Sequence, residues 1–214
     1  MSDLLEDPDR IAALENCIRK TASKPSEFLG YIEAGIHDPL VAVAVSPFIF
    51  SGGNQRFGCP GAGAYYAGNS FSVAISETLH HYALFLRKTP GVKRNELRCY
   101  CFVNRVNCDL VRILSGAVLN IEGHGDASAD EVLDPDCYTI SQTLAADLRA
   151  RGESGVVYPS VRQKGGECVA IFRIDGVEAP HDWSRLLYDW EGDAFSSVWH
   201  CDASFNKIKI FKYL

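Results

Sequence analysis

The chain has 214 residues, of which 47% are hydrophobic and 22% are charged, and its formal net charge is −6 at pH 7. This length and apolar content predict a globular chain that forms one domain, or one domain with an appendage, with enough apolar side chains for a sizeable core. The acidic balance argues against direct nucleic-acid binding, because phosphate backbones are bound by clustered Lys and Arg side chains.

The sequence also argues against a membrane protein. No run approaches the roughly 18 consecutive apolar residues of a membrane-spanning helix. The apolar run at residues 41–50 is short and is broken by Pro47. The first ten residues are acidic and contain no apolar core, so we expect no signal peptide and a cytoplasmic location.

The eight cysteines do not have the spacing of a metal site or of a disulfide framework. No CxxC pair and no Cys/His knuckle occur in the sequence. In a cytoplasmic protein we therefore expect free, mostly buried thiols and no bound metal.

The N-terminal residues 1–36 are predicted to be a helical part. Asp7-Pro8 is typical of a helix start, and the apolar spacing continues this helix to about residue 21. Residues 26–34 are a second candidate helix. Residues 40–50 follow as a buried apolar segment that ends at Ser51-Gly52-Gly53.

Residues 56–81 gather several chemically active side chains, and a glycine-rich loop, a strand and a helix are expected there. The strand covers residues 64–67. The helix begins near Phe71, with Asn69 or Ser70 as its N-cap, because a short polar side chain can accept from the free amides of the first turn. This stretch thus contains a cation, two aromatic rings, a carboxylate and two imidazoles: Arg56, Tyr65, Tyr66, Glu77, His80 and His81.

The spacing of apolar residues predicts which side of this helix is buried. One face is formed by Phe71, Ile75, Thr78 or Leu79, Tyr82 and Leu86. Glu77 lies off that face, and His80 and His81, three and four residues further on, lie beside it.

The second half of the chain is predicted to contain one more helix among several strands. Thr139 and Gln142 have the spacing of a capping box, Ile140, Leu144 and Leu148 give a buried face, and Gly152 ends the helix. Strands are expected at 97–103, 155–158, 167–173, 186–190, 195–200 and 207–213, a short apolar piece at 109–114, and a surface loop with one turn of helix at 116–136. This order predicts an α+β fold with mostly antiparallel sheets and flanking helices.

Three separated motifs in this sequence resemble the RES domain family, which is named for Arg, Glu and Ser. The first is Arg56-Phe57-Gly58, with Tyr66 ten residues after the arginine. The second is the run AISET, which contains Glu77 and is followed by the two histidines. The third is the segment GVVYPSVRQKGGECVAIF, in which Ser160 takes the third place. The resemblance covers most of residues 50–175, and it implies that residues 1–214 form a single RES-like domain around this motif-bearing core.

The resemblance implies a fold, an activity and a partner. RES proteins are toxins of bacterial toxin–antitoxin pairs, and their fold is similar to that of ADP-ribosyltransferases. They act on NAD as a substrate and cleave the nicotinamide N-glycosidic bond, with phosphate or water as acceptor. Their antitoxin is a helix-turn-helix protein that covers the active site. No further cofactor is implied, and homodimer formation is left open.

The chemistry of the side chains suggests a role for each candidate residue. A carboxylate at Glu77 would stabilise the cation-like ribose that forms as nicotinamide leaves. Arg56 could bind the pyrophosphate through its planar donors. Ser160 could orient Glu77 or the ribose, and Tyr66 could stack on nicotinamide.

The sequence leaves some residue assignments and some functions open. The segment between Arg56 and Tyr66 is richer in Gly and Ala than the family pattern, and the adjacent Tyr65 could replace Tyr66 as the ligand contact. His80 or His81 could also touch the ligand. Two other functions are consistent with the same residues: transfer of ADP-ribose to a protein or other acceptor, and a non-catalytic module that only binds a partner.

Overall fold

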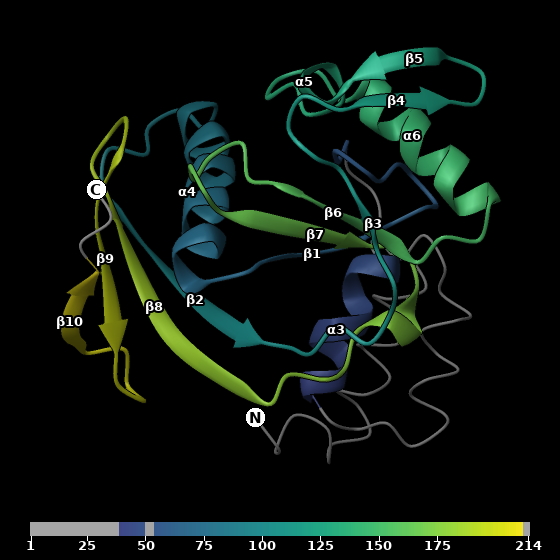
Figure 1. Cartoon of the computed structure of the whole chain (residues 1–214). Helices are drawn as coiled ribbons and strands as arrows, with labels where there is room; N and C mark the ends of the chain where they lie inside the picture. Colours follow the sequence, from purple (N-terminus) through teal and green to yellow (C-terminus); the bar gives the residue numbers. More distant parts are fainter. Residues whose placement is uncertain (1–38, 50–53, 212–214) are drawn as a thin grey trace. The chain divides into compact units, whose positions relative to one another are not determined.

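The structure is a computed structural model, and it describes residues 39–49 and 54–211. These residues form helices and mostly antiparallel strands (Figure 1), which confirms the predicted α+β class. The helices predicted at residues 7–21 and 26–34 lie outside the described residues.

The chain divides into two compact units, each assembled from three separated segments. Unit 1 comprises Met1–Tyr66, Arg105–Pro159 and Val169–Pro180, and unit 2 comprises Ala67–Asn104, Ser160–Cys168 and His181–Leu214. Arg56 and Tyr66 therefore belong to unit 1, whereas Glu77 and Ser160 belong to unit 2. The single RES-like domain expected from the sequence stays a prediction.

The apolar segment before the glycine-rich loop is a helix, α3 (Pro39–Ile49), which contains Pro47. A proline inside a helix lacks the amide hydrogen that would bond to the carbonyl four residues earlier. Here that carbonyl belongs to Val43, and the Ser46 hydroxyl donates to it at 3.4 Å. The neighbouring serine thus supplies the hydrogen bond that Pro47 cannot make, and the helix continues to Ile49.

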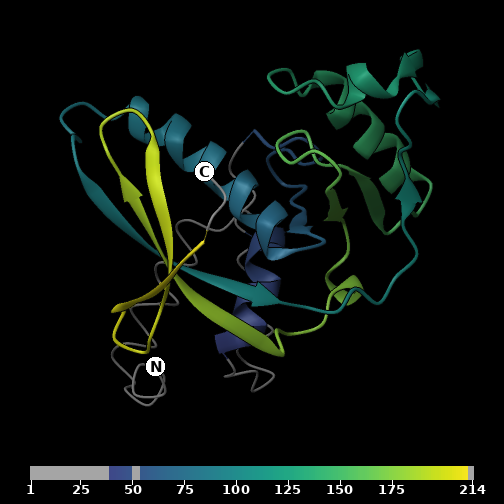
Figure 2. The same cartoon turned by 60° about the vertical axis from the view of Figure 1, so that its left-hand side comes forward.

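Unit 2 is built on a four-stranded antiparallel sheet in the order β10-β9-β8-β2. Its strands are β2 (Asn95–Val103), β8 (Asp182–Trp190), β9 (Phe195–Cys201) and β10 (Lys207–Phe211). The strands β2 and β8 lie side by side along nine residue pairs, from Asn95 opposite Trp190 to Val103 opposite Asp182 (Figure 2). The predicted strands in this part of the chain are confirmed, although β8 begins four residues earlier than expected.

The core of unit 2 lies where helix α4 (Phe71–Arg87) packs on one face of this sheet. Alternate residues of β8 point to the helix, because successive side chains of a strand face opposite sides. The buried cluster consists of Ile75, Leu86, Leu186, Tyr188, Trp190, Phe195 and Val198. Burial of these large side chains provides most of the driving force for holding the helix on the sheet.

The predicted start of α4 is confirmed, and its predicted buried face is confirmed except at one residue. Ser70 is the N-cap, and its hydroxyl accepts from the amide of Val73 at 3.3 Å. Tyr82, expected on the buried face, is 39% exposed. It borders a hollow of about 270 Å³ next to Cys99, Cys101 and Tyr188, so the helix and the sheet are not closely packed at this residue.

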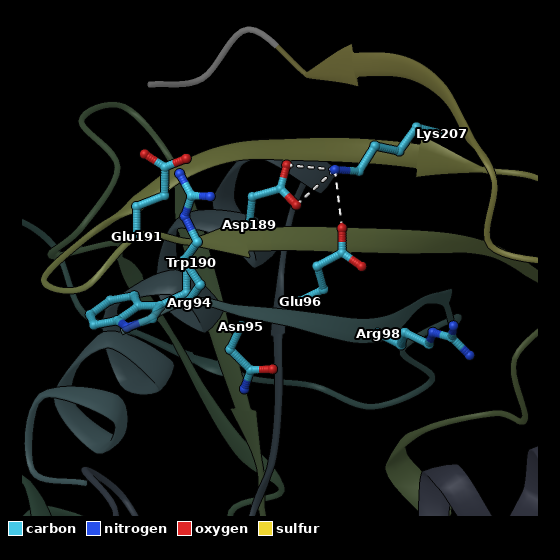
Figure 3. A pocket seen from close by; sticks show the side chains of 8 residues that line it. All are labelled: Arg94, Asn95, Glu96, Arg98, Asp189, Trp190, Glu191 and Lys207. Carbon is cyan, nitrogen blue, oxygen red and sulfur yellow. Dashed lines mark hydrogen bonds and ion pairs between the residues drawn. The ribbon is translucent and has the colours of Figure 1, made fainter. Parts of the chain in front are cut away.

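The opposite face of the unit 2 sheet carries a network of charges around Asp189 (Figure 3). The Lys207 ammonium lies 2.9 Å from both carboxylate oxygens of Asp189 and 3.3 Å from Oε1 of Glu96. Trp199 Nε1 donates to the same aspartate at 2.7 Å, and the Ser197 hydroxyl also donates to it. Because these residues come from β2, β8, β9 and β10, the network links all four strands.

Replacing Asp189 with Asn should destabilise the protein by about 1–3 kcal/mol at pH 7, because the substitution removes a charged acceptor of several hydrogen bonds. Burial disfavours the ionised carboxylate, but the hydrogen bonds from Ser197, Lys207 and Trp199 outweigh this effect and lower the pKa of Asp189. A lowered pKa adds stability above the pKa of the unfolded state, near 3.9, and this stability is lost as the pH falls through the folded-state value.

Urea unfolding at several pH values measures this effect. The difference between wild type and Asp189→Asn should be largest near neutral pH and should shrink below about pH 4. Asp175→Asn is a matched control, because it breaks the ion pair of Asp175 with Arg173, both of which are largely exposed, and exposed pairs contribute little. Equal losses in the two variants would contradict the proposed stabilising network.

Unit 1 contains a helix, α6 (Thr139–Ala150), that contacts β4 (Val118–Ile121), β6 (Gly155–Pro159) and the short helix α5 (Ala129–Val132). The prediction of a surface loop at 116–136 was wrong in part, because β4 pairs there with β5 (Gly125–Ser128) in an antiparallel hairpin. Alternation is hard to recognise in such short strands. The expected turn of helix is present as α5.

The capping box predicted for α6 is wrong, whereas the end of the helix at Gly152 is confirmed. Tyr138 is the N-cap, and no side chain caps the helix there. The Gln142 amide instead donates to Oδ1 of Asn54, to the carbonyl of Gln55 at 2.9 Å and to that of Gly58 at 3.3 Å. The Gln142 side chain thus binds the glycine-rich loop and does not reach back to the start of its own helix.

The remaining sheet has the strand order β1-β7-β6-β3, with β1 (Tyr65–Gly68), β3 (Val111–Arg112) and β7 (Glu167–Ile171). Strands β3 and β6 are parallel, whereas the pairings of the unit 2 sheet and of the β4–β5 hairpin are antiparallel. The loop between β6 and β7 begins at Ser160, and β1 leads into α4, the helix that carries Glu77. Strand β1 therefore precedes the helix that bears Glu77, and β6 precedes the loop that bears Ser160.

Candidate functional site

Glu77 and Ser160, which are 83 residues apart in sequence, are joined by a hydrogen bond in unit 2. The Ser160 hydroxyl donates to Oε1 of Glu77 at 2.7 Å. Both side chains are only partly buried, so solvent or a ligand can reach this pair. The structure thus brings together two of the three residues for which the RES pattern is named.

The hydrogen bonds around the Ser160 hydroxyl determine where its hydrogen points. A serine hydroxyl has one hydrogen to donate and two lone pairs that accept. The main-chain amides of Arg162 and Gln163 donate to Ser160 Oγ at 3.2 and 3.0 Å. Because both lone pairs are used, the hydrogen points to Glu77, and Glu77 is held as an acceptor.

The loop that carries Ser160 is fixed on α4 by further contacts. The Ser76 hydroxyl donates to Oε1 of Gln163 at 3.0 Å. The amide of Ser160 donates to the carbonyl of Gly166 at 2.9 Å and closes the loop. A Cβ at Gly166 would lie 2.4 Å from Cγ2 of Val73, so only glycine allows the loop to approach the helix this closely.

A second donor reaches the same oxygen of Glu77. The thiol of Cys168 lies 3.6 Å from Oε1 and donates to it. Cys168 is 3% exposed and lies in β7, just after the loop. Among the described residues, both hydrogen bonds to this carboxylate reach Oε1, which leaves Oε2 for another partner. No motif in the sequence pointed to Cys168, although the alternation of β7 places it on a buried side.

Arg56 is 7% exposed, and it joins the glycine-rich loop to residues 132–138 of unit 1. Its Nη1 donates to the carbonyls of Asp134 at 2.7 Å and Val132 at 3.4 Å. Its guanidinium carbon lies 4.7 Å from the centre of the Tyr138 ring. Among the described residues its hydrogen bonds use only Nη1.

Tyr66 also supports the glycine-rich loop. Its hydroxyl oxygen accepts from the amide of Phe57 at 2.8 Å. Burial raises the pKa of Tyr66 to about 12, so the hydroxyl stays protonated at neutral pH. The neighbouring Tyr65 is buried.

Arg149 is a further residue that positions this loop, and no motif in the sequence pointed to it. Its Nη2 donates to the carbonyls of Phe57 at 3.0 Å, Gly63 at 3.1 Å and Ala62 at 3.3 Å. The guanidinium also lies 4.0 Å from the ring centre of Phe172. An arginine near the end of a predicted helix gives no sequence signal for such long-range contacts.

His80 and His81 lie one turn after Glu77 on α4. Their rings contact each other edge to face, with centres 5.4 Å apart. His80 is half-buried and His81 is exposed.

The seven cysteines in the described part of the chain are free, but the expectation that most of them are buried is wrong there. Only Cys168 and Cys201 are buried, and Cys59 and Cys137 are exposed. Within residues 39–49 and 54–211, no cluster of three or more His, Cys, Asp or Glu side chains could hold a metal ion.

The comparison with protein families agrees with these motifs. The model of the RES domain matches residues 36–191, which is 156 of the 214 residues. The chain belongs to the RES domain family. This family is associated with toxin–antitoxin pairs and with reactions of NAD. No curated protein matches this RES domain significantly.

The match extends from α3 to the end of β8 in this RES domain and includes Arg56, Glu77 and Ser160. The strands β9 and β10, which complete the sheet of unit 2, lie beyond it. None of the helices in the described part of the chain has the length and apolarity that a membrane crossing needs.

Proposed function

We propose that this RES domain consumes NAD by breaking the bond between nicotinamide and its ribose. The observation that carries the proposal is the fixed carboxylate of Glu77, which accepts from Ser160 through Oε1. A carboxylate oriented in this way can stabilise the positive charge that develops on the ribose as the bond breaks. Among the described residues Oε2 has no hydrogen bond, so it is the oxygen proposed to face the sugar.

The proposed reaction is a displacement at the anomeric carbon of the nicotinamide ribose. The bond from that carbon to the pyridinium nitrogen breaks, and its electron pair leaves with neutral nicotinamide. An oxygen of phosphate or water then bonds to the carbon, and the acceptor loses a proton. The products are nicotinamide and either ADP-ribose phosphate or ADP-ribose.

We assign supporting roles to the other candidate residues. Arg56 is proposed to bind the pyrophosphate through guanidinium nitrogens other than Nη1, because that nitrogen donates to two carbonyls. Tyr66, or Tyr65 beside it, is proposed to contact nicotinamide, and His80 or His81 could touch the ligand. A cytoplasmic location, a helix-turn-helix antitoxin and an ADP-ribosyltransferase-like fold belong to the same proposal.

Product analysis tests this function directly. The purified protein is incubated with NAD labelled in the adenine, with and without phosphate, and the products are separated by chromatography. We expect free nicotinamide together with ADP-ribose phosphate or ADP-ribose. Label on a macromolecule, with little free ADP-ribose, would indicate an ADP-ribosyltransferase. Intact NAD after long incubation would contradict catalysis and favour a module that only binds a partner.

A further inference from the structure

The loop that carries Ser160 has two stems, and each stem provides one donor to the same carboxylate oxygen. Ser160 stands where the loop leaves β6, and Cys168 is the second residue of β7, where the loop ends. Ser160 Oγ lies 2.7 Å and Cys168 Sγ lies 3.6 Å from Oε1 of Glu77. The two donors therefore hold the carboxylate from both ends of one loop.

We propose that Cys168 is a positioning residue for Glu77. This inference rests on the proposed function, in which Glu77 stabilises the ribose cation. A carboxylate held at Oε1 by one donor alone can still turn about that contact. A second donor on the same oxygen restricts this rotation and keeps Oε2 directed at the sugar.

The burial of Cys168 makes the thiol suitable for this role. Its side chain is 3% exposed, so water does not replace the contact with Glu77. A thiol is a weak donor, and its hydrogen bonds strengthen when the acceptor is charged. It can thus orient the carboxylate without donating a full proton to it.

Infrared spectroscopy of the S–H stretch tests the contact itself, without any need for NAD turnover. The difference spectrum between wild type and Cys168→Ser isolates the band of the Cys168 thiol. If Glu77 accepts from this thiol, the band should move to higher frequency in the Glu77→Leu variant, which has no acceptor. An unchanged band would show that the thiol does not bond to Glu77 and would overturn the proposal.

Kinetics test the consequence of the contact. Cys168→Ala should lower kcat for NAD by about three- to tenfold, the loss of one weak donor, with a smaller change in KM. Cys168→Ser should retain most of the activity, because the hydroxyl can donate to the same oxygen. Equal activities of wild type and Cys168→Ala, or a serine variant no better than alanine, would overturn the positioning role.

Cys201→Ala is the matched control. Cys201 is also buried in unit 2, and its thiol donates to a main-chain carbonyl, that of Trp199, at 3.7 Å. The two alanine variants should therefore lose similar stability in thermal unfolding, but only Cys168→Ala should lose kcat. If wild type does not cleave NAD, the proposed function fails, whereas the infrared band still decides whether Cys168 holds Glu77.

Discussion

Replacing Glu77 with Gln should lower the rate of NAD cleavage by about a hundredfold or more. Glutamine keeps the size of the side chain and can still accept from Ser160, but it has no negative charge to stabilise the ribose cation. Loss of a single electrostatic group of this kind typically costs 10²–10³ in rate. Nicotinamide release measured at saturating NAD would report this loss.

Glu191→Gln provides the comparison for this variant, because it makes the same chemical change at an exposed residue of unit 2. Its activity should equal that of wild type, and both variants should keep the wild-type melting temperature within a few degrees. If Glu77→Gln cleaved NAD within a few-fold of the wild-type rate, the assignment of Glu77 as the catalytic carboxylate would be wrong.

Replacing Gly166 with Ala should also cause a large loss of NAD cleavage, because Gly166 lies where the loop that carries Ser160 contacts α4. A methyl group at this residue would lie 2.4 Å from Cγ2 of Val73 and 3.1 Å from the carbonyl of Gln163. Val73 is 2% exposed and cannot turn away, so Gly166→Ala should displace the loop and with it Ser160. We expect a loss of about 10- to 100-fold in NAD cleavage and about 1–3 kcal/mol in stability.

A second substitution should reverse much of this loss. Val73→Ala removes the atom that Gly166→Ala would meet, although by itself it leaves a cavity and costs roughly 2 kcal/mol. The double variant should thus be more stable and more active than the sum of the single effects predicts. Urea unfolding and nicotinamide release of the four proteins measure this coupling.

Gly68→Ala is a control that tests whether Val73→Ala specifically reverses the effect of Gly166→Ala. Its added methyl group would also contact Val73, with Cγ1 at 2.7 Å, but it would lie 2.9 Å from the main-chain nitrogen of Ala74 as well. Shortening Val73 cannot relieve a clash with the backbone, so Val73→Ala should not rescue Gly68→Ala. Independent, additive effects of Gly166→Ala and Val73→Ala would show that the loop does not rely on this contact.

Local patterns in the sequence predicted the elements of the fold well. The capping serine at residue 70, the apolar spacing of α4 and the alternation of β2 each arise from neighbours in sequence, and each is present in the structure. The hairpin β4–β5 was missed because its strands are only four residues long. Thr139 was wrongly predicted to form a capping box with Gln142. The Gln142 side chain instead bonds to the distant residues Asn54, Gln55 and Gly58, and a local pattern cannot reveal such contacts.

The sequence motifs predicted which residues belong to the candidate site, but not how these residues contact one another. The sequence pointed to Glu77 and Ser160, but their direct hydrogen bond depends on packing between α4 and a loop 83 residues away. The contribution of Cys168 to the same carboxylate, and that of Arg149 to the glycine-rich loop, depend on tertiary contacts alone. The catalytic and binding roles of these residues remain proposals.

The alternation of six chain segments between the two units has a consequence for synthesis of the protein. The chain passes from one unit to the other five times, so no single cut separates a complete unit. The sheet against which α4 packs needs β8, β9 and β10, and Glu77 therefore lacks its supporting core until residues 182–211 have left the ribosome. We expect nascent chains stalled before residue 180 to lack the proposed NAD cleavage, and a cell would be exposed to that proposed activity only after translation has passed β10.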